Sequence, residues 1–227
     1  CLRVTPVLFE LLGPVRARET YTSAPAAAPA RETHMNRIAL WLAAAALGVG
    51  LTACVPEFQN ALEGGNPADP ALIGNWSAKS GGDDAMLLDI AVKGDGVSVI
   101  LRDPKGGAEK LEFAGRTAEV NGTNYISLTP IDADAMGAGD VKVGYMIFRY
   151  EADGAGFKVW ALDGQAIAKA IENGQLKGTV TGSGTDTTPK VSASADEIAA
   201  FFATPEGQAA FAAGDPGDTL ILTRAKP

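Results

Sequence analysis

The chain has 227 residues and carries 19 Lys and Arg against 27 Asp and Glu, a formal net charge of −8 at pH 7. An acidic surface repels phosphates, so the composition argues against nucleic-acid binding. The only His is His34, and the two Cys are Cys1 and Cys54. After residue 54 the chain therefore excludes Ser-His-Asp and Cys-His catalysis, zinc sites of imidazole or thiolate, and a structural disulfide.

Residues 1–34 show no sustained hydrophobic period. They are a mixture of Arg, Ala, Pro and Thr, and residues 23–30 read Ser-Ala-Pro-Ala-Ala-Ala-Pro-Ala. Such a composition is typical of a polyproline-like or disordered segment. We expect residues 1–34 to be an over-extended gene model, with translation beginning at Met35.

Residues 35–53 have the pattern of an export signal. Met35 and Arg37 belong to a short basic start, and residues 38–50 carry no charge. A basic start, an apolar stretch of about 7–15 residues and small residues before a cleavage point are typical of such signals. A bilayer-spanning helix needs about 20 apolar residues, more than this stretch provides. An uncleaved signal-anchor is the open alternative.

Leu51-Thr52-Ala53-Cys54 closes this segment and resembles the lipobox of bacterial lipoproteins. The resemblance implies cleavage between Ala53 and Cys54, and acylation of Cys54 (palmitate, for example) at the mature N-terminus. Two or more acyl chains give stable membrane anchoring. Val55 stands where inner-membrane lipoproteins of the enteric type have Asp. The resemblance therefore implies a lipid-anchored cell-envelope protein on the periplasmic face of the outer membrane.

The chain from Cys54 onward is strongly acidic. It has 14 Lys and Arg against 24 Asp and Glu, a net charge of −10. Anionic lipid headgroups repel such a surface, so the acyl chains are its expected contact with the membrane. Residues 54–70 contain Gly64-Gly65-Asn66-Pro67 and are predicted to be a lipidated flexible tether. Residues 71–227 are long enough to bury the core of a single β-rich domain.

Alternating apolar residues predict antiparallel strands through most of this domain. A period of two places each apolar set on one face of a half-buried strand. Residues that tolerate positive φ separate the sets, at Gly94-Asp95-Gly96, Asn121-Gly122 and Asp153-Gly154. The alternating sets lie at 86–92, 97–101, 111–113, 126–128, 141–147 and 157–161.

Helix signals interrupt the strands late in the chain. Asp163 is placed to cap a helix over 164–173, and Ser194 and Glu197 have the spacing of a capping box. Thr204-Pro205 begins a third short helix, and a strand at 220–223 follows. The predicted fold is mainly β (α+β): an antiparallel meander sheet or small barrel of about eight strands, covered by two or three short helices near the C-terminus.

Gly74-Asn75-Trp76 resembles the Gly-x-Trp signature that opens lipocalins and related small barrels. In those proteins the Trp packs across the base of the barrel, and the interior above it holds an apolar ligand. The resemblance implies the same for Trp76, and a generic Trp packed under an antiparallel sheet is the alternative. Tyr145 and Trp160 join Trp76 as possible ligand or core residues.

Two other patterns bear on chemistry. The acidic run at 132–140 lacks the oxygen ligands that a calcium loop needs at its fifth and twelfth positions, so no metal or cofactor is predicted. Glycosidases need only two carboxylates at a set separation, and Asp89, Glu112 and Glu151 are candidates without a recognisable motif.

These observations favour a non-catalytic envelope lipoprotein over an enzyme. Its expected partner is a small apolar ligand or an envelope protein. The alternative is a carboxylate-dependent hydrolase acting on an envelope glycan. A deep cleft with paired carboxylates would favour the hydrolase, and an apolar cavity above Trp76 would favour ligand carriage.

Overall fold

The computed structural model describes residues 55–79, 85–102, 110–132, 143–153, 155–182, 187–211 and 219–225, all within one compact unit. The expected gene-model extension, export signal, start at Met35 and acylated Cys54 lie outside the described residues. None of the helices in the described ranges is long and apolar enough to cross a membrane.

Eight antiparallel strands close into a barrel, as the sequence predicts, in the order β11-β2-β3-β4-β5-β6-β7-β8. Every neighbouring pair is antiparallel, including the closing pair of β11 with β2. The strands are β2 (Gly74–Lys79), β3 (Ala85–Lys93), β4 (Gly96–Arg102), β5 (Lys110–Val120), β6 (Thr123–Pro130), β7 (Met146–Ala152), β8 (Gly156–Trp160) and β11 (Thr219–Arg224).

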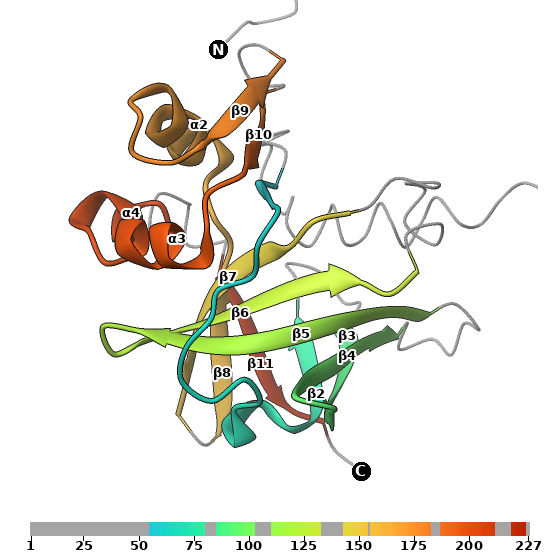
Figure 1. Cartoon of the computed structure of the whole chain (residues 1–227). Helices are drawn as coiled ribbons and strands as arrows, with labels where there is room; N and C mark the ends of the chain where they lie inside the picture. The colour runs from blue at the N-terminus through green and yellow to red at the C-terminus, as the bar shows by residue number, and fades with distance from the viewer. Residues whose placement is uncertain are drawn as a thin grey trace, which may run out of the picture. The chain divides into compact units, whose positions relative to one another are not determined.

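A second layer is formed by the segment between β8 and β11 together with β1, which precedes the barrel in the chain. It contains a three-stranded sheet in the order β1-β10-β9 and three helices, which Figure 1 shows gathered on one side of the barrel. Its elements are β1 (Glu57–Phe58), α2 (Gly164–Glu172), β9 (Gly178–Thr181), β10 (Thr188–Val191), α3 (Ala195–Phe202) and α4 (Pro205–Ala209). The expected short helices near the C-terminus are therefore present.

Local signals explain the helix starts. The Asp163 carboxylate accepts from the Gln165 amide at the start of α2. At α3 the Ser194 hydroxyl accepts from the Glu197 amide while the Glu197 carboxylate accepts from the Ser194 amide. Each bond satisfies a backbone donor that the first turn of a helix leaves without a partner.

Two hydrophobic cores lie on opposite sides of the barrel wall. The inner core fills the barrel, and the outer core lies between the wall and the second layer. The inner core consists of Leu72, Trp76, Ala78, Leu88, Ile90, Val97, Val99, Leu101, Leu111, Phe113, Ile126, Tyr150, Phe157 and Leu222. The outer core consists of Phe58, Leu62, Ala118, Tyr125, Ile147, Leu162, Ile167, Ala170, Leu176, Val191, Ala193, Ile198, Phe201, Phe202, Ala210 and Phe211.

The segment expected to be a flexible tether is folded from residue 56 onward, which corrects the prediction for 54–70. Phe58 and Leu62 are fully buried in the outer core. β1 pairs in parallel with β10, and the Leu62 amide donates to the Ser127 hydroxyl on β6. The Gly and Pro content of this segment predicts a free chain. Phe58 and Leu62 hold the segment in place instead, because the second layer supplies their packing partners from far along the sequence.

The barrel has two distinct ends. Because neighbouring strands are antiparallel, the chain leaves β2, β4, β6 and β8 at one end, which we call the mouth. The short turns at 94–95 and 121–122 lie at the other end, the base. The 3₁₀ helix η1 (Pro70–Leu72) also lies at the base, immediately before β2, as Figure 1 shows.

Candidate functional site

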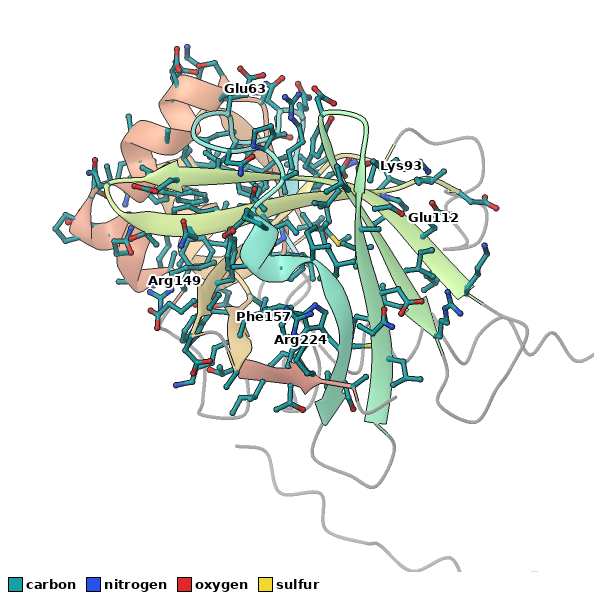
Figure 2. All side chains as sticks on the ribbon, turned by 90° about the horizontal axis from the view of Figure 1, so that it is seen from below. Glu63, Lys93, Glu112, Arg149, Phe157 and Arg224 are labelled. Carbon is teal, nitrogen blue, oxygen red and sulfur yellow. The ribbon has the colours of Figure 1, made fainter. Side chains whose placement is uncertain are left out.

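Trp76 is a core residue at the base of the barrel. Only 1% of its surface is exposed, and its indole Nε1 donates to the Leu72 carbonyl oxygen at 2.7 Å. Phe157 meets the ring edge-to-face at 4.7 Å between centroids. The Arg224 guanidinium lies over the ring at 4.0 Å, and Figure 2 shows Arg224 and Phe157 close together as seen from the base. Packing of this kind leaves the indole no free face for a ligand.

Arg224 completes the closure of the base, and Gly74 makes room for it. The Arg224 Nη1 atom donates to the Ile73 carbonyl oxygen at 2.9 Å. A Cβ atom on Gly74 would lie 1.8 Å from that nitrogen, and Gly74 has a φ of +140°. Sequence reasoning missed Arg224. The available signal was a basic residue on the last strand, which the register pairs with Trp76.

A polar cluster ties η1 to two strands. The Asp69 carboxylate accepts from the Tyr150 hydroxyl at 2.7 Å and from the Ala71 amide at 2.8 Å. The Asp69 amide donates to the Thr117 hydroxyl at 3.0 Å. Burial and then the bond to Asp69 raise the pKa of Tyr150 well above its usual value. The base is therefore sealed by a neutral phenol, a carboxylate and η1.

The mouth has different chemistry. Six inward-facing side chains near this end are apolar and only partly buried against the inner core. They come from five of the eight strands, so they are distributed around this end of the inner core rather than along one edge of it. The mouth residues are Met86 on β3, Leu128 on β6, Met146 and Phe148 on β7, Val159 on β8 and Leu220 on β11.

Tyr145 lies outside the barrel, not above Trp76. Its backbone pairs with Phe58, with N–O distances of 2.9 and 2.7 Å. The side chain is half-buried and borders an open cleft of about 340 Å³ beside the segment that follows β1. The cleft is lined by Gln59, Asn60, Ala61, Glu63, Arg116, Tyr145, Ser194 and Ala195. Its polar lining differs from the apolar mouth.

Trp160 belongs to the junction between the barrel and the second layer. It packs against the outer core, and the Arg149 guanidinium lies over its ring at 4.2 Å. The Arg149 Nε atom is buried and has no hydrogen-bond partner among the described residues. Trp76, Tyr145 and Trp160 therefore occupy three separate environments, and the structure does not bring them together as one site.

The candidate carboxylates lie apart from both the mouth and the cleft. Asp89 pairs with Arg102 at 2.5 Å, and Glu112 pairs with Lys93 at 2.9 Å on the outer wall, as Figure 2 shows for the second pair. The bonds from Lys93 and Ser98 lower the pKa of the Glu112 carboxyl. Glu151 is exposed. A general acid needs a raised pKa, so the lowered pKa of the Glu112 carboxyl does not suit that role.

Metal binding finds no support in the described ranges. Within them, no group of three or more His, Cys, Asp or Glu residues is placed to hold a metal ion. Of the acidic run at 132–140, only Asp132 is described, and it is exposed.

Comparison with known proteins returns no family model, no curated protein and no solved structure that matches this chain.

Proposed function

We propose that this chain is a bacterial cell-envelope lipoprotein, anchored through acylated Cys54, whose barrel binds a small apolar ligand without catalysing a reaction. One observation carries the ligand proposal. The barrel is sealed at its base by Trp76, Arg224 and η1, whereas its mouth presents half-buried apolar side chains. The Gly-x-Trp resemblance to lipocalins agrees with this difference between the two ends of the barrel, since in those proteins the ligand lies above the Trp.

The lining of the mouth defines the ligand class. Among the described residues, the mouth residues offer methyl, thioether and aromatic surface. They therefore favour a hydrocarbon chain or ring over a sugar or a nucleotide. Each buried methylene contributes about 0.8 kcal/mol, so eight of them contribute about 6 kcal/mol. That free energy corresponds to a Kd of roughly 40 μM before ordering costs are subtracted.

The packed inner core limits how deep a ligand lies. Leu88, Leu101 and Leu111 are buried just below the mouth. A ligand that stayed above them would contact the mouth residues, which fits exchange on a short timescale better than permanent retention. The Met side chains at 86 and 146 are flexible and adapt to ligands of different shape.

Matched charge substitutions on β11 test the ligand proposal. Leu220 faces the inside of the mouth, whereas Ile221 faces outward and is 55% exposed. In full-length protein carrying Cys54→Ser, which removes the acylation site, Leu220→Lys should abolish binding of a dansyl-labelled fatty acid. Ile221→Lys should retain it. Equal binding by the two variants, or none by the parent protein, contradicts the proposal. Met86→Gln replaces Leu220→Lys if thermal melting shows the latter unfolded.

The anchor is tested separately. Radiolabelled palmitate should enter the wild-type protein in its own cells and should not enter Cys54→Ser. Labelling of both proteins, or of neither, would contradict acylation at Cys54. Expression of the full chain and sequencing of the mature N-terminus would show whether cleavage precedes Cys54.

A further inference from the structure

The start of the folded chain lies at the mouth end of the barrel. The Gly144 amide, just before β7, donates to the Glu57 carboxylate at 3.1 Å, and Phe58 pairs with Tyr145. The chain then crosses the outer wall, where Leu62 contacts Ser127. It reaches the base at Asp69. Figure 1 shows this course, from β1 down to η1.

Very little chain separates Cys54 from this fixed start. Pro56 is already buried, and Val55 is the only exposed residue between it and Cys54. Two extended residues span at most about 7 Å. A free tether over 54–70 would have reached about 55 Å, enough for any orientation of the barrel. β5, with 11 residues, is about 36 Å long, so a link of this length cannot carry the base to the membrane while the mouth points away.

We propose that the mouth end of the barrel, with the start of β1 beside it, docks on the surface of the bilayer that holds the Cys54 acyl chains, and that the ligand is a membrane amphiphile whose acyl chain passes directly between bilayer and mouth. This inference rests on the proposed function. Among the described residues, its surface includes the mouth residues and the Glu57–Lys190 ion pair, whose atoms lie 3.1 Å apart.

The surface fits a bilayer better than a second protein. Its described side chains include the six apolar mouth residues, and pairing with Lys190 offsets the negative charge of Glu57. The net charge of −10 after residue 53 opposes adsorption to anionic lipid, so docking depends on the anchor. Without acyl chains the same protein should leave anionic vesicles.

Labels at the two ends of the barrel test the orientation. Ile131, just after β6, is 49% exposed at the mouth end, and Ala152, at the end of β7, is exposed at the base. A fluorophore is attached to Ile131→Cys or to Ala152→Cys in acylated full-length protein that also carries Cys1→Ser. The labelled protein is reconstituted in vesicles of phosphatidylethanolamine and phosphatidylglycerol that contain brominated lipid as the quencher. The mouth label should be quenched and the base label should not. Equal quenching of the two labels would overturn the proposal.

A longer link provides the matched control. Twelve Gly and Ser residues inserted between Val55 and Pro56 leave the lipobox and the fold unchanged. They should remove the difference between the labels and slow transfer of a dansyl-labelled fatty acid from vesicles about tenfold, because the effective concentration of the mouth at the bilayer falls. Transfer at the wild-type rate would contradict direct passage.

The failures of the two proposals are distinguishable. Palmitate incorporation is measured in the same preparations. Absence of palmitate defeats the anchored-lipoprotein proposal itself. Palmitate on Cys54 together with an unquenched mouth label defeats only the orientation of the barrel, and binding by wild type but not by Leu220→Lys would still support the ligand site.

Discussion

At the scale of single residues, the base of the barrel depends on Gly74, because a residue without a side chain leaves room for Arg224. Gly74 combines a positive φ with the space that the Arg224 guanidinium occupies. Gly74→Ala should lower the free energy of unfolding by at least about 2 kcal/mol, from backbone strain and the lost cation–π contact. Urea melts followed by Trp fluorescence measure this loss.

Gly94 offers a matched control for Gly74. It also has a positive φ, of +64°, but a Cβ atom added there would meet no other atom within 4 Å. Gly94→Ala should therefore cost only the backbone strain, about 1–2 kcal/mol. Adding Arg224→Ala to Gly74→Ala should cost less than the sum of the two single changes. Strict additivity would show that Gly74 and Arg224 do not share this space.

Tyr150 gives the fold an alkaline limit. Its folded pKa is raised by burial and by Asp69, so the neutral phenol is favoured. The associated stability is complete below the unfolded pKa of about 10 and is lost as pH rises above it. Tyr150→Phe should cost about 1–2 kcal/mol at pH 8 and make the decline between about pH 9 and 11 shallower. Urea melts across this pH range test the assignment. If the stability of Tyr150→Phe falls with pH as steeply as that of the wild type, the assignment is contradicted.

At the scale of elements, period-two patterns located most barrel strands and their inward faces, as for Leu88, Val99 and Phe113 in the inner core, but not the faces of β7. The set at 141–147 predicted one buried face for β7. Ile147 faces the outer core, whereas Tyr150 lies in the inner core and Met146 and Phe148 contact it, so β7 is buried on both sides. A single sequence shows the alternation but not the second layer that covers the outside.

Short elements with distant partners escaped prediction. β1 has only two residues, and its partners lie on β10 and beside β7. The helix starts were predictable because a cap and its target lie within three residues. Of the candidate site, Trp76 was identifiable from its motif, whereas Arg224, Tyr150 and Asp69 converge on the base only through the closed barrel.

Phe58 links the two layers and provides the test at this scale. It is fully buried and meets Phe202 edge-to-face at 6.2 Å between centroids. Phe58→Ala should cost about 3–5 kcal/mol in urea melts, because it leaves a cavity in the outer core. Gln59→Ala, at the exposed next residue, should stay within about 0.5 kcal/mol. Similar melts for both variants would restore the free-tether prediction.

At the scale of the described fold, we expect the outer core to make the barrel and the second layer one cooperative unit. Tyr125 and Ile147 of the barrel wall are buried against this layer, and the Tyr125 ring stacks on Phe202 at 5.3 Å between centroids. Separating the layers would expose this apolar surface of the wall to water, which costs about 25 cal/mol per Å². Neither layer is therefore expected to unfold alone.

Hydrogen exchange measures this coupling. Phe202→Ala should lower the opening free energy of amides in β6 and in β10 by the same amount, about 3–5 kcal/mol, because both elements open only by global unfolding. Phe113→Ala, inside the barrel, should affect the same two strands alike. If Phe202→Ala instead lowers protection in β10 while β6 keeps its wild-type value, the second layer opens independently. Such opening would also release β1 and lengthen the link to Cys54, and the mouth would then lose its fixed orientation toward the bilayer.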